Sequence, residues 1–131
     1  MRALLPIVLL PIVVVFAVAF FSIEVASGQD ADRYKKVASQ LVELINAGDY
    51  AGIQTKFNQE MGAALPLDKA SEFFKELTQQ VGKIKKLGKP QPVGEAMVFP
   101  TEFEKDTLDM QIALDGRGQI AALTFTPHVV R

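Results

Sequence analysis

The side chains that could perform acid–base chemistry are few in this chain. His128 is the single imidazole, and it follows Pro127 near the end of the sequence. A general base needs a fixed position and an orienting partner, and chain ends seldom supply either. We therefore expect His128 to be an exposed tail residue. Glu102 and Asp109 are the other candidates, because two neighbouring carboxylates can share a proton or bind a cation.

The composition excludes several other chemistries. The 131 residues include no Cys, which rules out disulfides, thiolate metal sites and cysteine nucleophiles. A single His cannot form a multi-histidine metal site. The net charge of −1, from 14 basic and 15 acidic residues, disfavours a nucleic-acid-binding protein. We expect no catalytic constellation, no cofactor and no bound metal ion.

The first 28 residues have the pattern of an export signal. Arg2 precedes an apolar run over residues 3–21, and the small residues 26–28 precede the polar Gln29. This order is typical of a secretory signal peptide and predicts cleavage after Gly28. The run also approaches the length that crosses a bilayer, so an uncleaved membrane anchor over residues 3–21 is the alternative. In both cases we expect a domain in the periplasm or outside the cell.

The remaining chain, residues 29–131, is predicted to be a single domain that begins with helices. Apolar residues recur at helical spacing over residues 31–46, 49–57 and 68–81, which predicts three amphipathic helices. We expect Gly48 to end the first helix in a left-handed conformation. Asp49 and Asp68 are the expected N-caps of the second and third helices.

After Gly82 the apolar period changes to two, which indicates strands. Strands are predicted at residues 83–89, 95–104, 107–114 and 119–126, with a loop at 90–94 that contains Pro90 and Pro92. Pro100 has no N–H, so its strand is expected to be an edge there or bulged. Lysines in the segment 83–89 are typical of an edge strand that avoids further pairing.

Turn positions predict the register of the last three strands. A turn at Lys105–Asp106 places Thr101 opposite Met110, and a four-residue turn at 115–118 places Met110 opposite Leu123. The apolar rows of all three strands then share one face. Ile120 falls on the other face, as do Asp109 and Glu102 in a solvated acidic rim. The expected fold class is α+β, with three N-terminal helices packed on one face of an antiparallel sheet of three to four strands.

Several short segments resemble a family of exported bacterial domains of unknown function, the 3887 family, within the superfamily of nuclear transport factor 2 and the SnoaL-like proteins. They are Ala47-Gly48-Asp49-Tyr50, Phe57 with Met61, Ala64-Leu65-Pro66, Val81-Gly82, residues 103–109 and residues 115–120. The resemblance implies a cystatin-like cone with a curved sheet, dimerisation through that sheet, and a hydrolase as a partner. It supplies no catalytic residues. The chain has Ala122 where the family pattern leads us to expect a glycine, which argues against the usual bulge.

These observations predict a non-catalytic binding or interaction domain. Its partner would be a small apolar ligand, a second copy of the chain or a hydrolase. If the cone holds a cavity, its expected lining is aromatic and apolar: Tyr34, Tyr50, Phe57, Phe74, Phe99 and Met110. Two alternatives stay open. One is a SnoaL-like isomerase or cyclase with a pocket carboxylate, such as Asp109, as its base; the other is an assembly factor anchored in the membrane.

Overall fold

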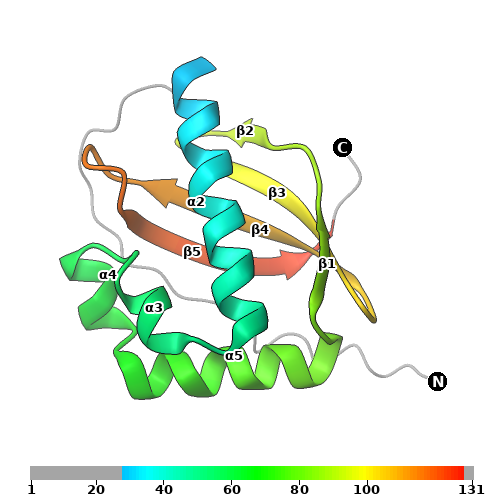
Figure 1. The fold of residues 1–131 in the computed structure, drawn as a ribbon. Coiled ribbons are helices and arrows are strands. Elements are labelled where there is room, and N and C mark those ends of the chain that lie inside the picture. Colours follow the sequence, from blue (N-terminus) through cyan, green and yellow to red (C-terminus); the bar gives the residue numbers. More distant parts are fainter. Residues whose placement is uncertain (1–27, 129–131) are drawn as a thin grey trace.

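A computed structural model describes residues 28–128 of the chain as a mixed α+β fold (Figure 1). The α+β class predicted from the sequence is confirmed. Its helices are α2 (Gly28–Ala47), α3 (Tyr50–Gln54), α4 (Gln59–Ala64) and α5 (Leu67–Val81). Its strands are β1 (Ile84–Leu87), β2 (Gln91–Val93), β3 (Ala96–Phe103), β4 (Thr107–Leu114) and β5 (Ile120–Pro127).

The predicted export signal lies outside the described residues, apart from Gly28 at the start of α2. Among the helices formed by residues 28–128, none combines the length and the apolar character that a membrane span requires.

The helix ends follow the predicted local chemistry at two positions and differ at two others. Gly48 ends α2 with a φ of +71°, and the Asp49 carboxylate accepts a hydrogen bond from the Gly52 N–H at 2.9 Å, as expected of an N-cap. The N-cap of α5 is Pro66, not Asp68, which lies in the first turn where a carboxylate favours the helix dipole. Residues 58–66, which lie between two predicted helices, contain the additional helix α4, in which the Asn58 side chain accepts a hydrogen bond from the Met61 N–H as the N-cap.

The sheet has five antiparallel strands in the described part of the chain, against three to four expected. Its order is β1-β3-β4-β5, and β2 also pairs with β3, so the expected loop at residues 90–94 was wrong. Pro100 therefore lies in a central strand, not at an edge. It is tolerated because β3 changes its neighbour there: Val98 pairs with β2, whereas Thr101 pairs with β1. The missing N–H of Pro100 falls in the gap between those two short strands.

The register between β3 and β4 is shifted by two residues from the prediction. Thr101 lies opposite Leu108 instead of Met110. The cause is the turn, which is one residue earlier than expected: the Phe103 N–H donates to the Asp106 carbonyl at 2.8 Å, so Glu104 and Lys105 form its centre. Both turn residues are held from outside, because the Glu104 N–H donates to the Lys83 carbonyl and the Lys105 N–H to the Val81 carbonyl, each at 2.9 Å. A shift of two keeps every side chain on its predicted face.

The register between β4 and β5 contains a bulge, although Ala122 stands where a glycine was expected to accompany one. Leu114 pairs with Ile120, but the next pair is Ala113 with Ala122, so β5 has one extra residue at Ala121. An extra residue reverses the side-chain alternation. As a result Ile120 is fully buried in the core, and Ala121 is not part of the core cluster, the reverse of the prediction. Beyond the bulge Met110 pairs with Phe125 instead of Leu123.

The core lies between the helices and the sheet face that carries Phe99, Met110 and Leu123, which we call the inner face. All three side chains are at most 4% exposed. Helix α2 crosses the sheet in Figure 1 and is joined to it by a hydrogen bond from the Leu114 N–H to the Tyr34 hydroxyl at 2.9 Å. Thr101 is the polar residue of this face, and its hydroxyl donates to the Phe99 carbonyl at 2.9 Å. The prediction that the apolar rows of β3, β4 and β5 share one face is correct, apart from Ala121.

Candidate functional site

The opposite face of the sheet, which we call the outer face, is formed by the alternate residues of β3, β4 and β5. Three cross-strand rows can be followed: Val98–Gln111–Thr124, Pro100–Asp109–Thr126 and Ala113–Ala122. The two-residue shift moves Asp109 away from Glu102, which lies opposite Thr107. The predicted acidic rim is therefore not formed. Asp109 is 3% exposed instead of solvated.

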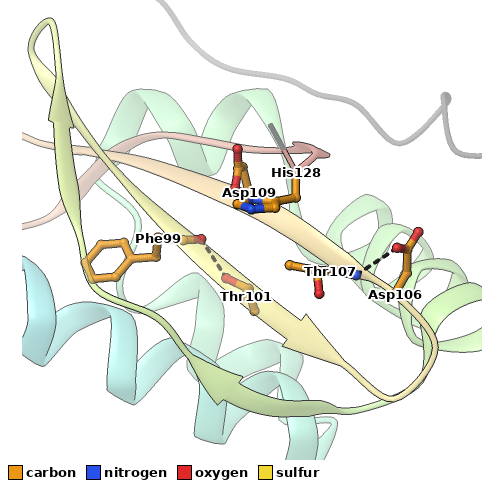
Figure 2. Close-up of polar contacts among 6 residues, drawn as sticks. All are labelled: Phe99, Thr101, Asp106, Thr107, Asp109 and His128. Carbon is orange, nitrogen blue, oxygen red and sulfur yellow. Dashed lines mark hydrogen bonds and ion pairs between the residues drawn. The ribbon is translucent and has the colours of Figure 1, made fainter. Parts of the chain in front are cut away.

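Asp109 and His128 are two titratable side chains in direct contact on this face, among the residues that the structure describes. The His128 Nδ1 lies 2.7 Å from the Asp109 Oδ1, and Figure 2 shows the two side chains lying against each other. The carboxylate side chain is 4% exposed and the imidazole 34%. His128 is exposed, as expected, but it has a partner that the sequence did not predict. Because Asp109 pairs with Thr126, two residues before His128, the backbone of β5 brings the imidazole directly to the carboxylate.

The geometry of this pair resembles a histidine held for acid–base work. A carboxylate at Nδ1 orients the ring and selects the tautomer that carries its proton on Nδ1, which leaves Nε2 to exchange a proton. The same contact also has a structural effect, because it ties the end of β5 to the middle of β4. A catalytic role needs a bound substrate beside Nε2, whereas the structural role needs nothing further.

We expect the structural contribution of the pair to be modest and measurable. In the His128→Ala variant the Asp109 carboxylate loses one charge-assisted hydrogen bond, at a half-exposed position where water replaces part of it, so the free energy of unfolding should fall by about 1 kcal/mol. Urea unfolding monitored by circular dichroism measures this difference. The control is Gln111→Ala, an exposed outer-face residue, for which we expect a change within about 0.5 kcal/mol. Equal effects of the two substitutions would show that the contact does not hold β5.

The residues predicted to line a ligand cavity lie on the inner side of the sheet. Tyr34, Phe57, Phe74, Phe99 and Met110 belong to the buried core cluster, and Tyr50 packs against it half-buried. Phe74 has aromatic neighbours on three sides, with ring centroids 4.9–6.5 Å away: Tyr50, Phe73 and Phe125. Their role as ligand contacts remains a prediction.

An open groove of about 740 Å³ lies where α4 meets the turn between β4 and β5. Its lining includes Glu60, Arg117 and Gln119. The Asp115 carboxylate is occupied structurally: Oδ1 accepts the backbone N–H groups of Arg117 and Gln119, and Oδ2 accepts the Asn58 amide at 3.3 Å. The groove is thus the rim of a tight turn, and the described side chains around it form no acid–base pair.

Other charged groups do not form a site in the described part of the chain. Within residues 28–128, no three His, Asp or Glu side chains are grouped closely enough to hold a metal ion. The lysines of the segment 83–89 are exposed, and β1 is an edge of the sheet, as expected of residues that oppose further strand pairing.

Sequence reasoning missed the Asp109–His128 contact because it depends on register. In the predicted pairing of β4 with β5, Asp109 lay opposite Thr124. The observed pairing of these two strands differs by two residues and places Asp109 opposite Thr126. An aspartate at an outward position of β4 and the single histidine directly after β5 were the available signals.

The comparisons with known proteins identify one family. The family model described as "protein of unknown function (DUF3887)" matches residues 38–123, from the middle of α2 to the middle of β5. No curated protein and no solved structure showed significant similarity to the chain. Asp109 lies within the matched residues and His128 lies after them.

Proposed function

Since the chain belongs to the DUF3887 family, whose description assigns no activity, we propose from its geometry that it is an exported, non-catalytic domain that acts by self-association through its sheet. Export is inferred from the signal-like residues 1–28. We also infer a cone of the nuclear-transport-factor-2-like type, with the helices on one side of a curved sheet. A hydrolase is a second expected partner, by resemblance to other domains of this kind.

The observation that carries the proposal is the division between the two faces of the sheet. The inner face is taken up by the core, where apolar side chains from all four described helices and from the sheet form one buried cluster. The middle of the outer face carries small, apolar or uncharged side chains that are at least partly exposed, and these lie around the buried Val98: Pro100, Gln111, Ala113, Ala122 and Thr124. Its central charge, Asp109, is paired with His128. A sheet with this distribution favours association over solvation, because few charges must be desolvated on contact.

The test is the mass of the purified full-length protein in solution. Size-exclusion chromatography with light scattering, run across a wide concentration range, should give twice the chain mass that intact mass spectrometry finds in the same sample. The spectrometry also shows whether the first 28 residues have been removed. A protein that stays monomeric at every concentration would overturn self-association. A protein recovered whole in the membrane fraction would favour the anchored assembly factor.

The Asp109–His128 pair favours a second candidate, an enzyme that uses acid–base chemistry. The oriented imidazole can act as a general base if a substrate binds beside Nε2. The His128→Ala variant separates the two functions. For a non-catalytic domain, hydrolysis of p-nitrophenyl acetate by the wild type should not exceed the rate given by free imidazole at the same concentration. A substantially higher rate that disappears in the variant would favour the enzyme.

A further inference from the structure

The two edges of the sheet differ in how they meet solvent. The β1 edge carries the exposed Lys85 and Lys86, and the chain then continues through Pro90 and Pro92, which cannot donate to a neighbouring strand. The opposite edge is β5, Ile120–Pro127, which has no charged side chain over its whole length. Sheet proteins usually protect their edges with charges or prolines. The β1 edge therefore has this protection, whereas β5 lacks it until Pro127.

The backbone of β5 directs two consecutive pairs of hydrogen-bonding groups away from the sheet. The Phe103–Asp106 bond shows that β4 uses its even-numbered residues to bond β3, since bonded pairs alternate along antiparallel strands. The odd-numbered residues of β4 therefore bond β5. The same alternation continues past β4, where the Asp115 N–H donates to the Gln119 carbonyl at 2.8 Å. The hydrogen-bonding partners of these β4 residues in β5 are Ala122, Thr124 and Thr126. The N–H and C=O groups of Leu123 and Phe125 point to the open side, where no other element within residues 28–128 bonds them.

Both ends of this open stretch are fixed. At one end the Ile120 N–H donates to the Lys56 carbonyl and the Ile120 carbonyl accepts the Asn58 N–H, both at 2.8 Å, so the segment before α4 occupies the edge. At the other end Pro127 has no N–H, and the His128 contact with Asp109 holds the strand in place. The stretch of β5 between these points, residues 121–126, is an extended strand held on the sheet, and no other segment of residues 28–128 pairs with its open edge.

We propose that the β5 edge pairs antiparallel with the β5 edge of a second copy of this chain, with Thr124 on the two-fold axis. This rests on the proposed self-association and names the surface that performs it. In this register Leu123 of one copy exchanges both backbone hydrogen bonds with Phe125 of the other, and the same pair recurs across the axis. The two five-stranded sheets become continuous, and both open backbone pairs of each copy are satisfied.

A second copy fits this edge because β5 is complementary to itself. Across the axis Thr124 faces Thr124, and Ala122 faces Thr126, so small uncharged side chains meet on the outer side. The large side chains of Leu123 and Phe125 stay in the core of their own copy, where they are at most 4% exposed. A charged foreign strand would find no opposite charge on β5, since the strand has none.

The test places charges on the two-fold axis of the full-length protein. Thr124→Lys and Thr124→Asp each set two like charges directly opposite each other, and each should raise the dimer dissociation constant about tenfold or more. In an equal mixture of the two variants, the lysine of one copy faces the aspartate of the other. The mixture should therefore form dimers with about the dissociation constant of the wild type. Gln111→Lys, on the outer face one strand further in, distinguishes edge pairing from association through the face, because only the second places this lysine at the interface. The matched control is Glu43→Lys, an exposed position on α2, which should dimerise with the dissociation constant of the wild type.

The possible results separate the surface from the function. If both Thr124 variants dimerise with the dissociation constant of the wild type, pairing through the β5 edge is overturned while self-association stands. If Gln111→Lys dissociates the dimer instead, the interface is the outer face. A monomeric wild type would overturn both proposals. Hydrogen exchange needs no variant: the Leu123 and Phe125 amides of the wild type should become protected as its concentration rises through the dissociation constant. Unchanged exchange at these two amides would also overturn the edge pairing.

Discussion

Replacing Phe74 by alanine should lower the free energy of unfolding by about 3–5 kcal/mol, because it deletes a large side chain that is fully buried. Phe74 joins three elements: its ring is edge-on to Phe73 at 4.9 Å and to Phe125 of β5 at 6.4 Å, and it stacks with Tyr50 of α3 at 6.5 Å. Domains of this size are stable by only about 5–15 kcal/mol. The variant should therefore unfold at a much lower urea concentration.

The neighbouring residue is the control for this substitution. Phe73 lies on the same helix and its ring also contacts Phe74 and Phe125, but it is only partly buried. Phe73→Ala should cost clearly less than Phe74→Ala. If the two variants unfold alike, the interior is less tightly packed at Phe74 than the structure indicates, and the predicted ligand cavity becomes more plausible than a filled core.

Alternation along the strands was sufficient to predict which face of the sheet is buried. Met110 and Leu123 are both buried in the core, as their spacing required. The pairing of the strands could not be read in the same way, because a shift of two residues leaves every side chain on its face. The turn decides between such registers. Here Glu104 and Lys105 are fixed by backbone bonds to Lys83 and Val81, contacts made far along the chain.

The bulge in β5 shows where a residue pattern is misleading. Ile120-Ala121-Ala122 contains no glycine to indicate an extra residue. The bulge is stabilised from outside the strand, because Ile120 bonds both Lys56 and Asn58 and is drawn into the core. By contrast, α4 and β2 have local partners, because Asn58 caps its own helix and β2 pairs with the next strand, β3. Only the bulge depends on a segment distant in sequence.

The candidate site was predicted less well than the fold for the same reason. Asp109 was recognised as a chemically able residue, but its neighbour follows from the register of β4 and β5. Its burial follows from the tertiary structure. By contrast, the uncharged β5 strand and the lysine-bearing β1 strand are visible in the sequence. What the structure adds is that these two strands are the opposite edges of one sheet.

The second large effect is expected at Asn46, in the last turn of α2. Its side-chain amide makes the two hydrogen bonds that a neighbouring strand would make with Ile84. Nδ2 donates to the Ile84 carbonyl and Oδ1 accepts from the Ile84 N–H, both at 2.9 Å. These two bonds join α2 to β1 across 38 residues of sequence. Asn46→Ala removes both and leaves the Ile84 backbone groups without protein partners in a partly buried position. The free energy of unfolding should fall by about 2–4 kcal/mol.

Two further variants test the cause of that loss. Asn46→Asp keeps an acceptor for the Ile84 N–H but sets a carboxylate against the Ile84 carbonyl, so it should recover little of the stability. Glu43→Ala, an exposed change on the same helix, should stay within about 0.5 kcal/mol of the wild type. Urea unfolding of the three variants makes the comparison. An Asn46→Ala protein as stable as Glu43→Ala would mean that water satisfies the Ile84 groups and that packing alone attaches α2 to β1.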